Sequence, residues 1–314
     1  MLPINPARRV QFVNQGAVYS PGQKNNIVQT LSESRLKNAR RFAVGVICGG
    51  MPENEEAFAA LRELEVKTII SVSGSPADTE LARRYGMLCV HLPTGFSGLT
   101  DLRGLEIARA VHDNPEIAYI CADDGSDRAP AAAAVVCVVF GTMTPEKAVR
   151  ALKSVNVPES SKGLYAWVAA ASKVESEAVH AVKIRFHEKE DVGAVTKAMV
   201  ALGKAGGRLQ AALSGDPKVQ AGKAGAELVK TFAELRELQD VTAQSEEFRR
   251  LLTASQTAAA AVSEAAGSIK VKATPEQLGK LETGLQALNS SCAACHSQYR
   301  DDVQQNAQIG KRVK

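Results

Sequence analysis

The two halves of this chain follow different sequence patterns, and that difference limits the folds open to it. Up to about residue 173, short apolar runs rich in Val and Ile alternate with helix-like stretches. From about residue 190 onward the sequence has no comparable strand pattern and is rich in Ala, Leu, Lys, Glu and Gln. With 314 residues, the chain is long enough for two ordinary domains. We therefore expect an α/β domain over 1–175, a linker over 176–190 and an all-α domain over 191–314.

The first domain is expected to contain a largely parallel sheet with helices on both faces. The predicted strands are Ala43–Cys48, Thr68–Ser73, Met87–Leu92 and Ile117–Cys121. The helix-like stretches are 54–64, 77–85, 101–112, 129–141, 144–153 and 161–173. Strands that alternate with helices in this way are typical of parallel sheets. The longest apolar stretch, Ala129 to Met143, is too short to cross a bilayer and predicts a buried helix, so we expect no transmembrane segment.

Sequence signals for helix ends place four helices in the second domain. The predicted starts lie near Asp191, at Asp216-Pro217, near Ser245 and at Thr274-Pro275-Glu276-Gln277. The second start combines a cap residue with Pro in the first turn, and the last is a capping box. The first helix is predicted to end at Gly215 and the third at about Gly267. Four helices with short connections are typical of an antiparallel four-helix bundle.

The join between the two domains permits two interpretations. The apolar residues Val182, Ile184 and Phe186 alternate there with Lys183, Arg185 and His187. This period of two makes a short strand as plausible as a helix, and it does not say which domain owns the segment.

Near the end of the chain, the run Cys292-Ala293-Ala294-Cys295-His296 has the C-x-x-C-H spacing of a heme-attachment site. On a helix, positions i, i+3 and i+4 share one face. Two thiols on that face can add to the two vinyl groups of one heme, and the adjacent imidazole can reach its iron. Redox-active C-x-x-C pairs and half of a zinc site share the spacing. Because no second Cys/His pair with zinc-like spacing accompanies the run, we favour one covalent heme c with His296 as axial ligand.

Apolar residues on the predicted last helix repeat at spacings of three and four. The stripe comprises Leu278, Leu281, Leu285, Leu288, Cys292, Cys295 and Tyr299. It predicts that both thiols face the core of the bundle. The predicted first helix carries a similar stripe, made of Val192, Val195, Met199, Leu202, Gly206, Leu209 and Leu213. Met199 is the one soft ligand on it, and either fills the sixth iron position or serves as core packing.

The second domain resembles the class II cytochromes c, of the cytochrome c′ and cytochrome c-556 type. The stretch CAACHSQYR matches that family's last helix, and AMVALGKAGGRL resembles the first-helix segment that holds the axial Met in its low-spin members. The resemblance implies Met199 as sixth ligand and pairing of Arg300 with a heme propionate. It also implies a homodimer, since bundles of this type often pair. His180 and His187 precede the first helix and are alternative ligands for the iron.

The sixth ligand separates two possible functions. With Met199 bound, the iron is saturated and suited to one-electron transfer with a redox partner protein. Without Met199, an apolar open face would bind a small gas such as nitric oxide. We favour electron transfer.

Thiols are joined to heme outside the bacterial cytoplasm, so the motif predicts a periplasmic or otherwise exported protein. The N-terminal sequence MLPINPARRV lacks the apolar core of a signal peptide, so we expect an export leader that this sequence does not include. The net charge of +4 is mild, and the basic pairs Arg8-Arg9 and Arg249-Arg250 lack aromatic neighbours. Both observations argue against a nucleic-acid binder.

In the first domain, the segment from Tyr119 to Arg128 ends a predicted strand and opens a predicted helix. It resembles the H-C-x-x-G-x-x-R loop of dual-specificity and tyrosine phosphatases. The resemblance extends over roughly residues 15–170, through the runs GGMPENEEAFAALRELEVKTIISVSG and GMLCVHLPTGFSG. In that family a cysteine thiolate attacks a phosphate that loop amides and the arginine hold. Aligning Gly125 and Arg128 with the loop puts Ala122 at the nucleophile position and Cys121 where the family has His.

Three features predict that this phosphatase-like domain is catalytically degenerate. A slip of one residue on a strand reverses the face to which Cys121 points. Asp123 and Asp124 place negative charge in a loop that would hold a dianion. The run PTGFSGLT supplies no general acid near Pro93, and Asp101 is better explained as a helix cap.

Some function is still expected of this loop. The candidate catalytic residues are Cys121 and Arg128. The candidate anion-binding residues of a docking module are Gly125, Ser126 and Arg128. The alternative to a docking module is a phosphatase that the heme domain regulates.

The remaining cysteines are Cys48, Cys89, Cys121 and Cys137, in three predicted strands and one predicted helix. We interpret them as small buried apolar residues. An oxidising compartment would also permit disulfides among them, and the sequence does not indicate a pairing.

Overall fold

The computed structural model describes residues 28–31, 35–96, 101–114, 116–216, 219–269 and 273–299. The chain divides into two compact units, Met1–Glu190 and Asp191–Lys314. Each unit is described by itself below. Among the described helices, none has both the length and the apolar character needed to span a bilayer.

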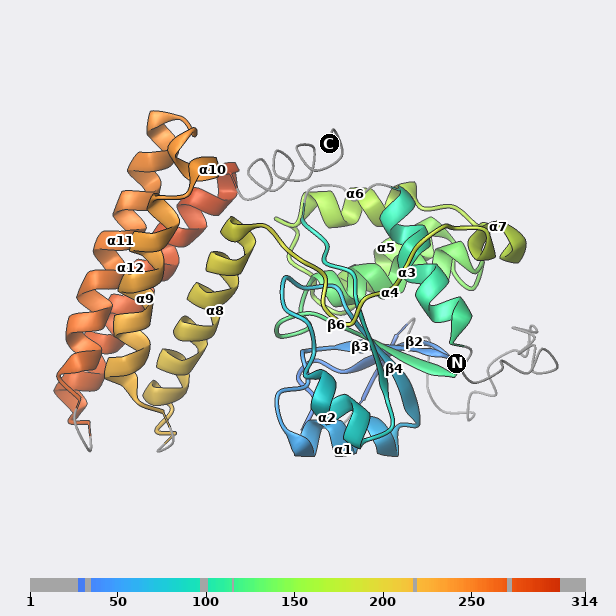
Figure 1. The fold of residues 1–314 in the computed structure, drawn as a ribbon, viewed down its shortest axis with the longest axis horizontal. Helices are drawn as coiled ribbons and strands as arrows, with labels where there is room; N and C mark the ends of the chain where they lie inside the picture. Colours follow the sequence, from blue (N-terminus) through green and yellow to red (C-terminus); the bar gives the residue numbers. More distant parts are fainter. Residues whose placement is uncertain are drawn as a thin grey trace. The chain divides into compact units, whose positions relative to one another are not determined.

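The first unit is built on a six-stranded mixed sheet (Figure 1). The strands, in their order across the sheet, are β1 (Gln29–Thr30), β2 (Arg40–Ala43), β3 (Val46–Gly49), β6 (Ile117–Cys121), β4 (Val66–Ser71) and β5 (Leu88–His91). The four strands from β3 to β5 run parallel, whereas β1 and β2 pair antiparallel at one edge. The predicted α/β class, with a sheet that is parallel over most of its width, is confirmed.

The predicted single strand Ala43–Cys48 is wrong, because the chain reverses inside it. The strands β2 and β3 form an antiparallel pair, with a turn at Val44 and Gly45 between them. Val44 is 77% exposed, and its carbonyl accepts a hydrogen bond from the Arg41 guanidinium at 3.0 Å. The apolar character of Val44 made the run look continuous, although this side chain points into solvent at a turn.

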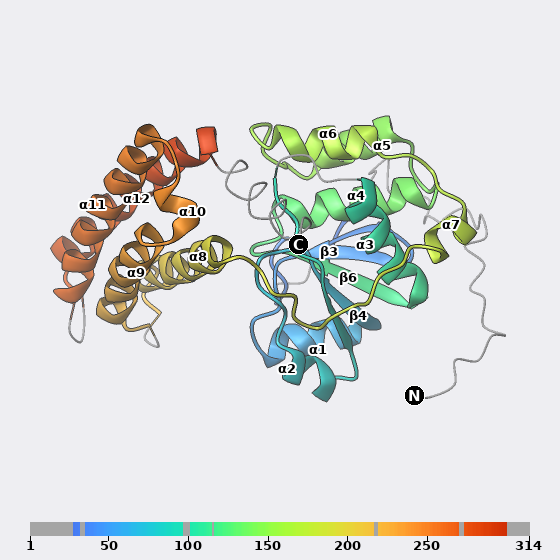
Figure 2. The same cartoon turned by 45° about the horizontal axis from the view of Figure 1, so that its top comes forward.

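Helices cover both faces of this sheet (Figure 2). One face carries α1 (Glu55–Glu63) and α2 (Thr79–Arg84). The other face carries α3 (Asp101–Asp113), α4 (Arg128–Val139), α5 (Pro145–Ser154) and α6 (Lys162–Ala170). The helix α4 is buried along its whole length, as its unbroken apolar sequence predicts. Along β6, Tyr119 and Cys121 belong to the α1/α2 face, whereas Ile120 and Ala122 belong to the α4 face.

The segment before the second unit packs on the first. It contains α7 (Ser176–His180), followed by an extended stretch over 182–187 that is neither strand nor helix. Ile184 and Phe186 are half-buried against the core beside α4, while the charged residues between them are exposed. The period of two in the sequence therefore corresponds to alternating burial on the surface of the first unit, where the His187 carbonyl accepts a hydrogen bond from the His91 amide of β5 at 2.8 Å.

In its described part, the second unit is helical. Its long helices are α8 (Ala194–Leu213), α9 (Ala221–Arg236), α11 (Glu246–Gly267) and α12 (Pro275–Tyr299), with a short α10 (Gln239–Thr242) after α9. They enclose one apolar core. The predicted starts of α11 and α12 are confirmed by their caps. The Ser245 hydroxyl accepts from the Phe248 amide at 3.2 Å, and the Thr274 amide donates to the Gln277 side chain at 2.9 Å.

The predicted start of the second helix at Asp216-Pro217 is wrong. The helix α9 begins at Ala221, and Pro217 lies outside the described residues. Asp216 serves the end of α8 instead, because its amide donates to the Ala211 carbonyl at 3.1 Å. Gly215, with a φ of 81°, adopts the left-handed conformation, and its amide donates to Ala212 at 3.1 Å. Together these contacts form a Schellman motif, which uses the residue that the sequence suggested as an N-cap.

Candidate functional sites

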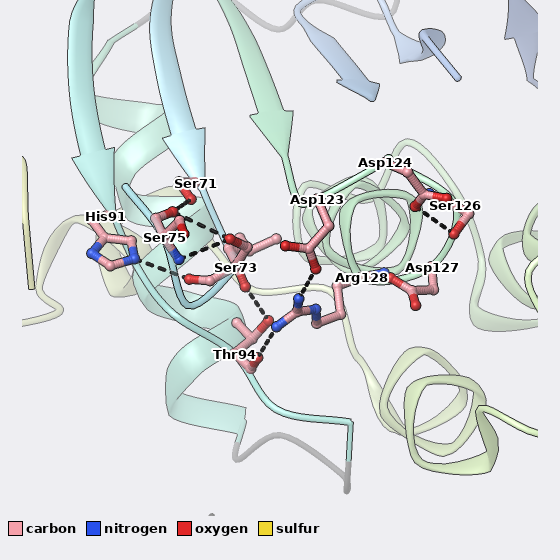
Figure 3. Close-up of polar contacts among 11 residues, drawn as sticks. Ser71, Ser73, Ser75, His91, Thr94, Asp123, Asp124, Ser126, Asp127 and Arg128 are labelled. Atoms are coloured by element: carbon pink, nitrogen blue, oxygen red, sulfur yellow. Dashed lines mark hydrogen bonds and ion pairs between the residues drawn. The ribbon is translucent and has the colours of Figure 1, made fainter. Parts of the chain in front are cut away.

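The phosphatase-like loop, residues 122–127, joins the carboxyl end of β6 to the first residue of α4 (Figure 3). In open α/β sheets, ligands bind outside the carboxyl ends of parallel strands, and a helix N-terminus there attracts anions. Gly125 has a φ of 78°, and a Cβ on it would lie 2.2 Å from the carbonyl carbon of Gly49. Only glycine fits this position, because the opposing atoms belong to the backbone of β3.

The Arg128 side chain lies beside this loop and is already paired. Its guanidinium donates to the Thr94 carbonyl at 3.1 Å and forms an ion pair with Asp123. The guanidinium also stacks over the Phe96 ring, 4.9 Å from the ring centroid. Its Nε is buried and has no hydrogen-bond partner among the described residues. The arginine is thus held in place, with its guanidinium paired to a carboxylate of its own chain.

Two further carboxylates bind donors of the same loop. Asp124 accepts from the Ser126 amide at 3.0 Å and from the Ser126 hydroxyl at 2.7 Å. Asp127 accepts from the backbone amide of Arg128, the first residue of α4. The loop therefore has the donors of an anion-binding site, but acidic side chains of the loop itself engage them (Figure 3).

The Cys121 side chain lies on the opposite face of the sheet from α4, the helix that begins at Arg128. Its side chain is buried in the core under α1 and α2, and its Sγ donates to the Met51 sulfur at 3.6 Å. Burial raises the pKa of the Cys121 thiol well above its usual value, and electrostatic repulsion from Cys89 and Asp123 raises it further. Ala122 packs with the α4 face instead. The geometry agrees with the reversal of face that the sequence predicted, and it leaves the thiol protonated.

Sequence reasoning missed a polar cluster beside the loop, at the ends of β4 and β5. The Thr94 hydroxyl donates to the Val72 carbonyl at 2.9 Å. Nδ1 of the buried His91 ring accepts a hydrogen bond from the Glu190 amide at 2.9 Å. The ring proton is therefore on Nε2, which donates to the Ser73 carbonyl at 3.0 Å. Burial lowers the pKa of His91. A polar residue at the end of an otherwise apolar strand was the available signal for this cluster.

The described residues that follow β5, through Phe96, include no acid, as the sequence run requires. Asp101 is the first residue of α3. The four remaining cysteines, Cys48, Cys89, Cys121 and Cys137, are buried free thiols.

On α12, the stripe predicted from the sequence faces the core of the second unit. Cys295 is 8% exposed, and Cys292 is half-buried against the same core. Burial raises the pKa of both thiols, while hydrogen bonds from Ser255 and Ser291 lower that of Cys292. The next residue, His296, lies on the exposed side of the helix. The two sulfurs and the imidazole therefore come from one turn of one helix.

The end of α12 is fixed against the start of α11. Tyr299 packs edge-on against Phe248 with ring centroids 5.3 Å apart, and its hydroxyl lies 3.4 Å from that of Ser245. Arg300, the expected propionate partner, lies outside the described residues.

Met199 lies on α8, half-buried against the core that contains the two thiols. Within this unit, α8 begins and α12 ends at the same end (Figure 1). Met199 comes five residues after the start of α8, and Cys295 four residues before the end of α12. At 1.5 Å per residue, both lie roughly 6–8 Å from that end along their helices. Both residues thus lie within about two turns of the helix ends that share one end of the unit.

These residues fit a heme of the c type. The two thiols that would form the thioether bonds face the core, and the imidazole that would ligate the iron is the next residue, on the exposed side of the same helix turn. Met199 and Leu202 of α8, with Cys292 and Tyr299 of α12, are partly buried apolar side chains that pack on the same core.

No protein-family model and no curated protein matches this chain. Among solved structures, the chain is similar to TpbA of P. aeruginosa, with 17% identity and a TM-score of 0.40, over 49% of this chain and 93% of that one. It is also similar to a protein of Shewanella putrefaciens CN-32 described as a candidate phosphatase (DUF442). That match has 20% identity and a TM-score of 0.36, over 44% of this chain and 95% of that one. Likeness at these values assigns no activity to this chain.

Proposed function

We propose that this protein is an exported c-type monoheme protein that transfers single electrons. The observation that carries the proposal is the placement of Cys292 and Cys295 toward the core on one turn of α12, with His296 next to them. The second unit would then be a four-helix bundle of the class II cytochrome c type.

In this proposal, covalently bound heme supplies a one-electron iron couple within the helical unit. Cys292 and Cys295 hold the group by thioether bonds, and His296 ligates the iron from the same helix turn. Met199 lies near the start of α8 on the same core and is the proposed sixth ligand, whose thioether would raise the reduction potential. The apolar side chains around the thiols exclude water and lower the local dielectric, which tunes the potential further.

Covalent attachment is tested on the chain produced with an export signal in a host that matures c-type cytochromes. We expect a red protein whose colour survives acid–acetone extraction and whose mass increases by one heme. Cys292→Ala with Cys295→Ala should abolish covalent heme. His296→Ala should lose the axial ligand, whereas Gln298→Ala, an exposed residue two positions further along the same helix, is the matched control. Colourless mature protein, or a chromophore that extracts, would contradict the proposal.

The sixth ligand decides between electron transfer and gas binding. Met199→Ala should allow rapid carbon monoxide binding to the reduced protein and lower the reduction potential. Leu213→Ala, on the same helix and also half-buried but 14 residues further along, should change neither. If the unaltered protein already binds carbon monoxide as fast as Met199→Ala does, the alternative of a five-coordinate gas-binding protein holds instead.

We further propose that the first unit is a catalytically degenerate phosphatase-like domain that serves as a docking or anion-binding module. The buried position of Cys121 and the carboxylates bound to the loop support this proposal. The test is hydrolysis of an aryl phosphate by the full chain, where we expect no turnover above buffer. Turnover that Cys121→Ser removes, in a variant that still folds, would establish the alternative of a heme-regulated phosphatase.

A further inference from the structure

A second group of ligand-type side chains lies in the first unit, away from the phosphatase-like loop. His112 and Asp113 end α3, and His180 ends α7. One potential ligand atom from each of the three lies within 4.8 Å of the others. The Asp113 Oδ1 is 3.5 Å from His112 Nδ1 and 3.8 Å from His180 Nδ1.

The His112 ring is oriented with a nitrogen toward this cluster. Its Nε2 lies 2.9 Å from the Ser176 hydroxyl at the start of α7. Its Nδ1 is buried and has no hydrogen-bond partner among the described residues. A proton on Nε2, shared with the Ser176 hydroxyl, leaves the lone pair of Nδ1 for a metal ion, and a hydrogen bond at the non-ligating nitrogen is usual for metal-ligating histidines.

Arg109 joins the two helix ends that carry the ligands. Its Nε donates at 2.7 Å to Asp113 Oδ1, the same oxygen that faces the two histidines, and its Nη1 donates to the carbonyls of His180 and, at 3.1 Å, Val182. Its positive charge would oppose a cation beside it. The C-terminal end of α3, a helix of 13 residues, supplies negative dipole charge at the same place and offsets part of that repulsion.

We propose that His112, Asp113 and His180 bind a divalent transition-metal ion, Zn²⁺ in particular. Zinc bonds of 2.0–2.2 Å in tetrahedral geometry separate neighbouring ligand atoms by about 3.4 Å. The two distances to Asp113 Oδ1 are close to that value, so small rotamer changes would complete the site. Two imidazoles and one carboxylate are a known catalytic-type zinc ligand set, with the fourth position open to water.

The ion would fasten α7 to α3. The segment that follows α7 carries Ile184 and Phe186 across the first unit and leads into the second. Zinc would therefore hold the start of this segment in place, and it would do so whether or not the second unit carries heme.

The first test titrates Zn²⁺ against a chromogenic chelator, using the full chain with Cys292→Ser and Cys295→Ser, which removes competing thiols and makes the result independent of heme. We expect one tight equivalent of zinc. His112→Ala and His180→Ala should each weaken it at least tenfold, and His187→Ala, in the same segment but outside the cluster, should not. Absence of stoichiometric zinc, or equal weakening by His187→Ala, would overturn the proposal.

The second test needs no substitution in the cluster and so avoids variants that fail to fold. Diethylpyrocarbonate modifies accessible imidazoles, and mass spectrometry of peptides locates each modified histidine. Zinc should protect His112 and His180 and leave the exposed His187 reactive. Equal protection of His187, or none at His180, would count against the site.

Discussion

Replacing Asp123 by Asn should convert the phosphatase-like loop from a blocked into a working anion site. Asp123 is the carboxylate paired with Arg128, and its φ of 28° lies in a region that Asn tolerates. Asn keeps the size of the side chain and removes its charge. An anion would then no longer compete with this carboxylate for the guanidinium.

The size of the effect follows from the exposure of the pair. The Arg128 side chain is 11% exposed and that of Asp123 57%, so the pair lies between a surface and a buried one. Surface pairs contribute about 0–1 kcal/mol and hydrogen bonds to charged groups about 1.5–3 kcal/mol, so we take about 1–2 kcal/mol for this pair. Since 1.4 kcal/mol is tenfold in affinity, removing the competitor should raise phosphate affinity by about 5- to 30-fold.

The assay is the shift of the urea unfolding midpoint with inorganic phosphate, followed by fluorescence. Trp167 is the chain's one tryptophan and is buried in the first unit, so its emission reports that unit. Adding Arg128→Lys to Asp123→Asn should abolish the gain. Glu55→Gln, which removes an exposed carboxylate paired with Arg84, is the charge-matched control. An equal gain in that control, or no gain in Asp123→Asn, would refute the reasoning.

Two further predictions concern the stability of the first unit, again measured through Trp167. The new methyl group of Gly86→Ala meets no atom within 4 Å, so this variant should lose only about 1–2 kcal/mol of folding stability, the cost of a left-handed backbone for a residue other than glycine. The methyl group of Gly125→Ala also collides with the Gly49 backbone, so that variant should lose about 1–3 kcal/mol more. Equal losses in the two variants would mean that the close approach to β3 is unimportant. Because burial lowers the pKa of folded His91, the unfolded chain takes up the extra proton as pH falls below about 6.5, so stability should be lost on going from about pH 7.5 to about pH 5.5. His91→Gln should flatten that dependence, and an unchanged slope in this variant would assign it to other groups.

Local sequence signals predicted much of the secondary structure. The cap at Ser245 and the capping box at Thr274 involve residues three apart, so the sequence contains both partners of each contact. The same holds for the stripe on α12, whose spacing alone indicates a shared face. The alternation of faces along β6 is also local, which is why the position of Cys121 relative to Ala122 could be predicted.

Local signals failed where two interpretations of the same residue compete. Asp216 is a good N-cap in isolation, but the left-handed Gly215 turns the chain so that the Asp216 amide hydrogen-bonds to a carbonyl in the last turn of α8. Val44 is of a residue type that favours strands, yet it lies at the turn between β2 and β3.

The sequence by itself determined the two kinds of domain, the heme-type spacing on the last helix and the absence of a cysteine at the loop's nucleophile position. The spacing on the last helix depends on residues within two turns of each other, where helix periodicity fixes the geometry, whereas the nucleophile position is what the resemblance to the phosphatase loop implies. Only the tertiary structure placed His180 beside His112 and Asp113, or the Glu190 amide on the His91 ring. Those contacts join segments far apart in the chain, and their geometry depends on the path that the whole core imposes on the backbone between them.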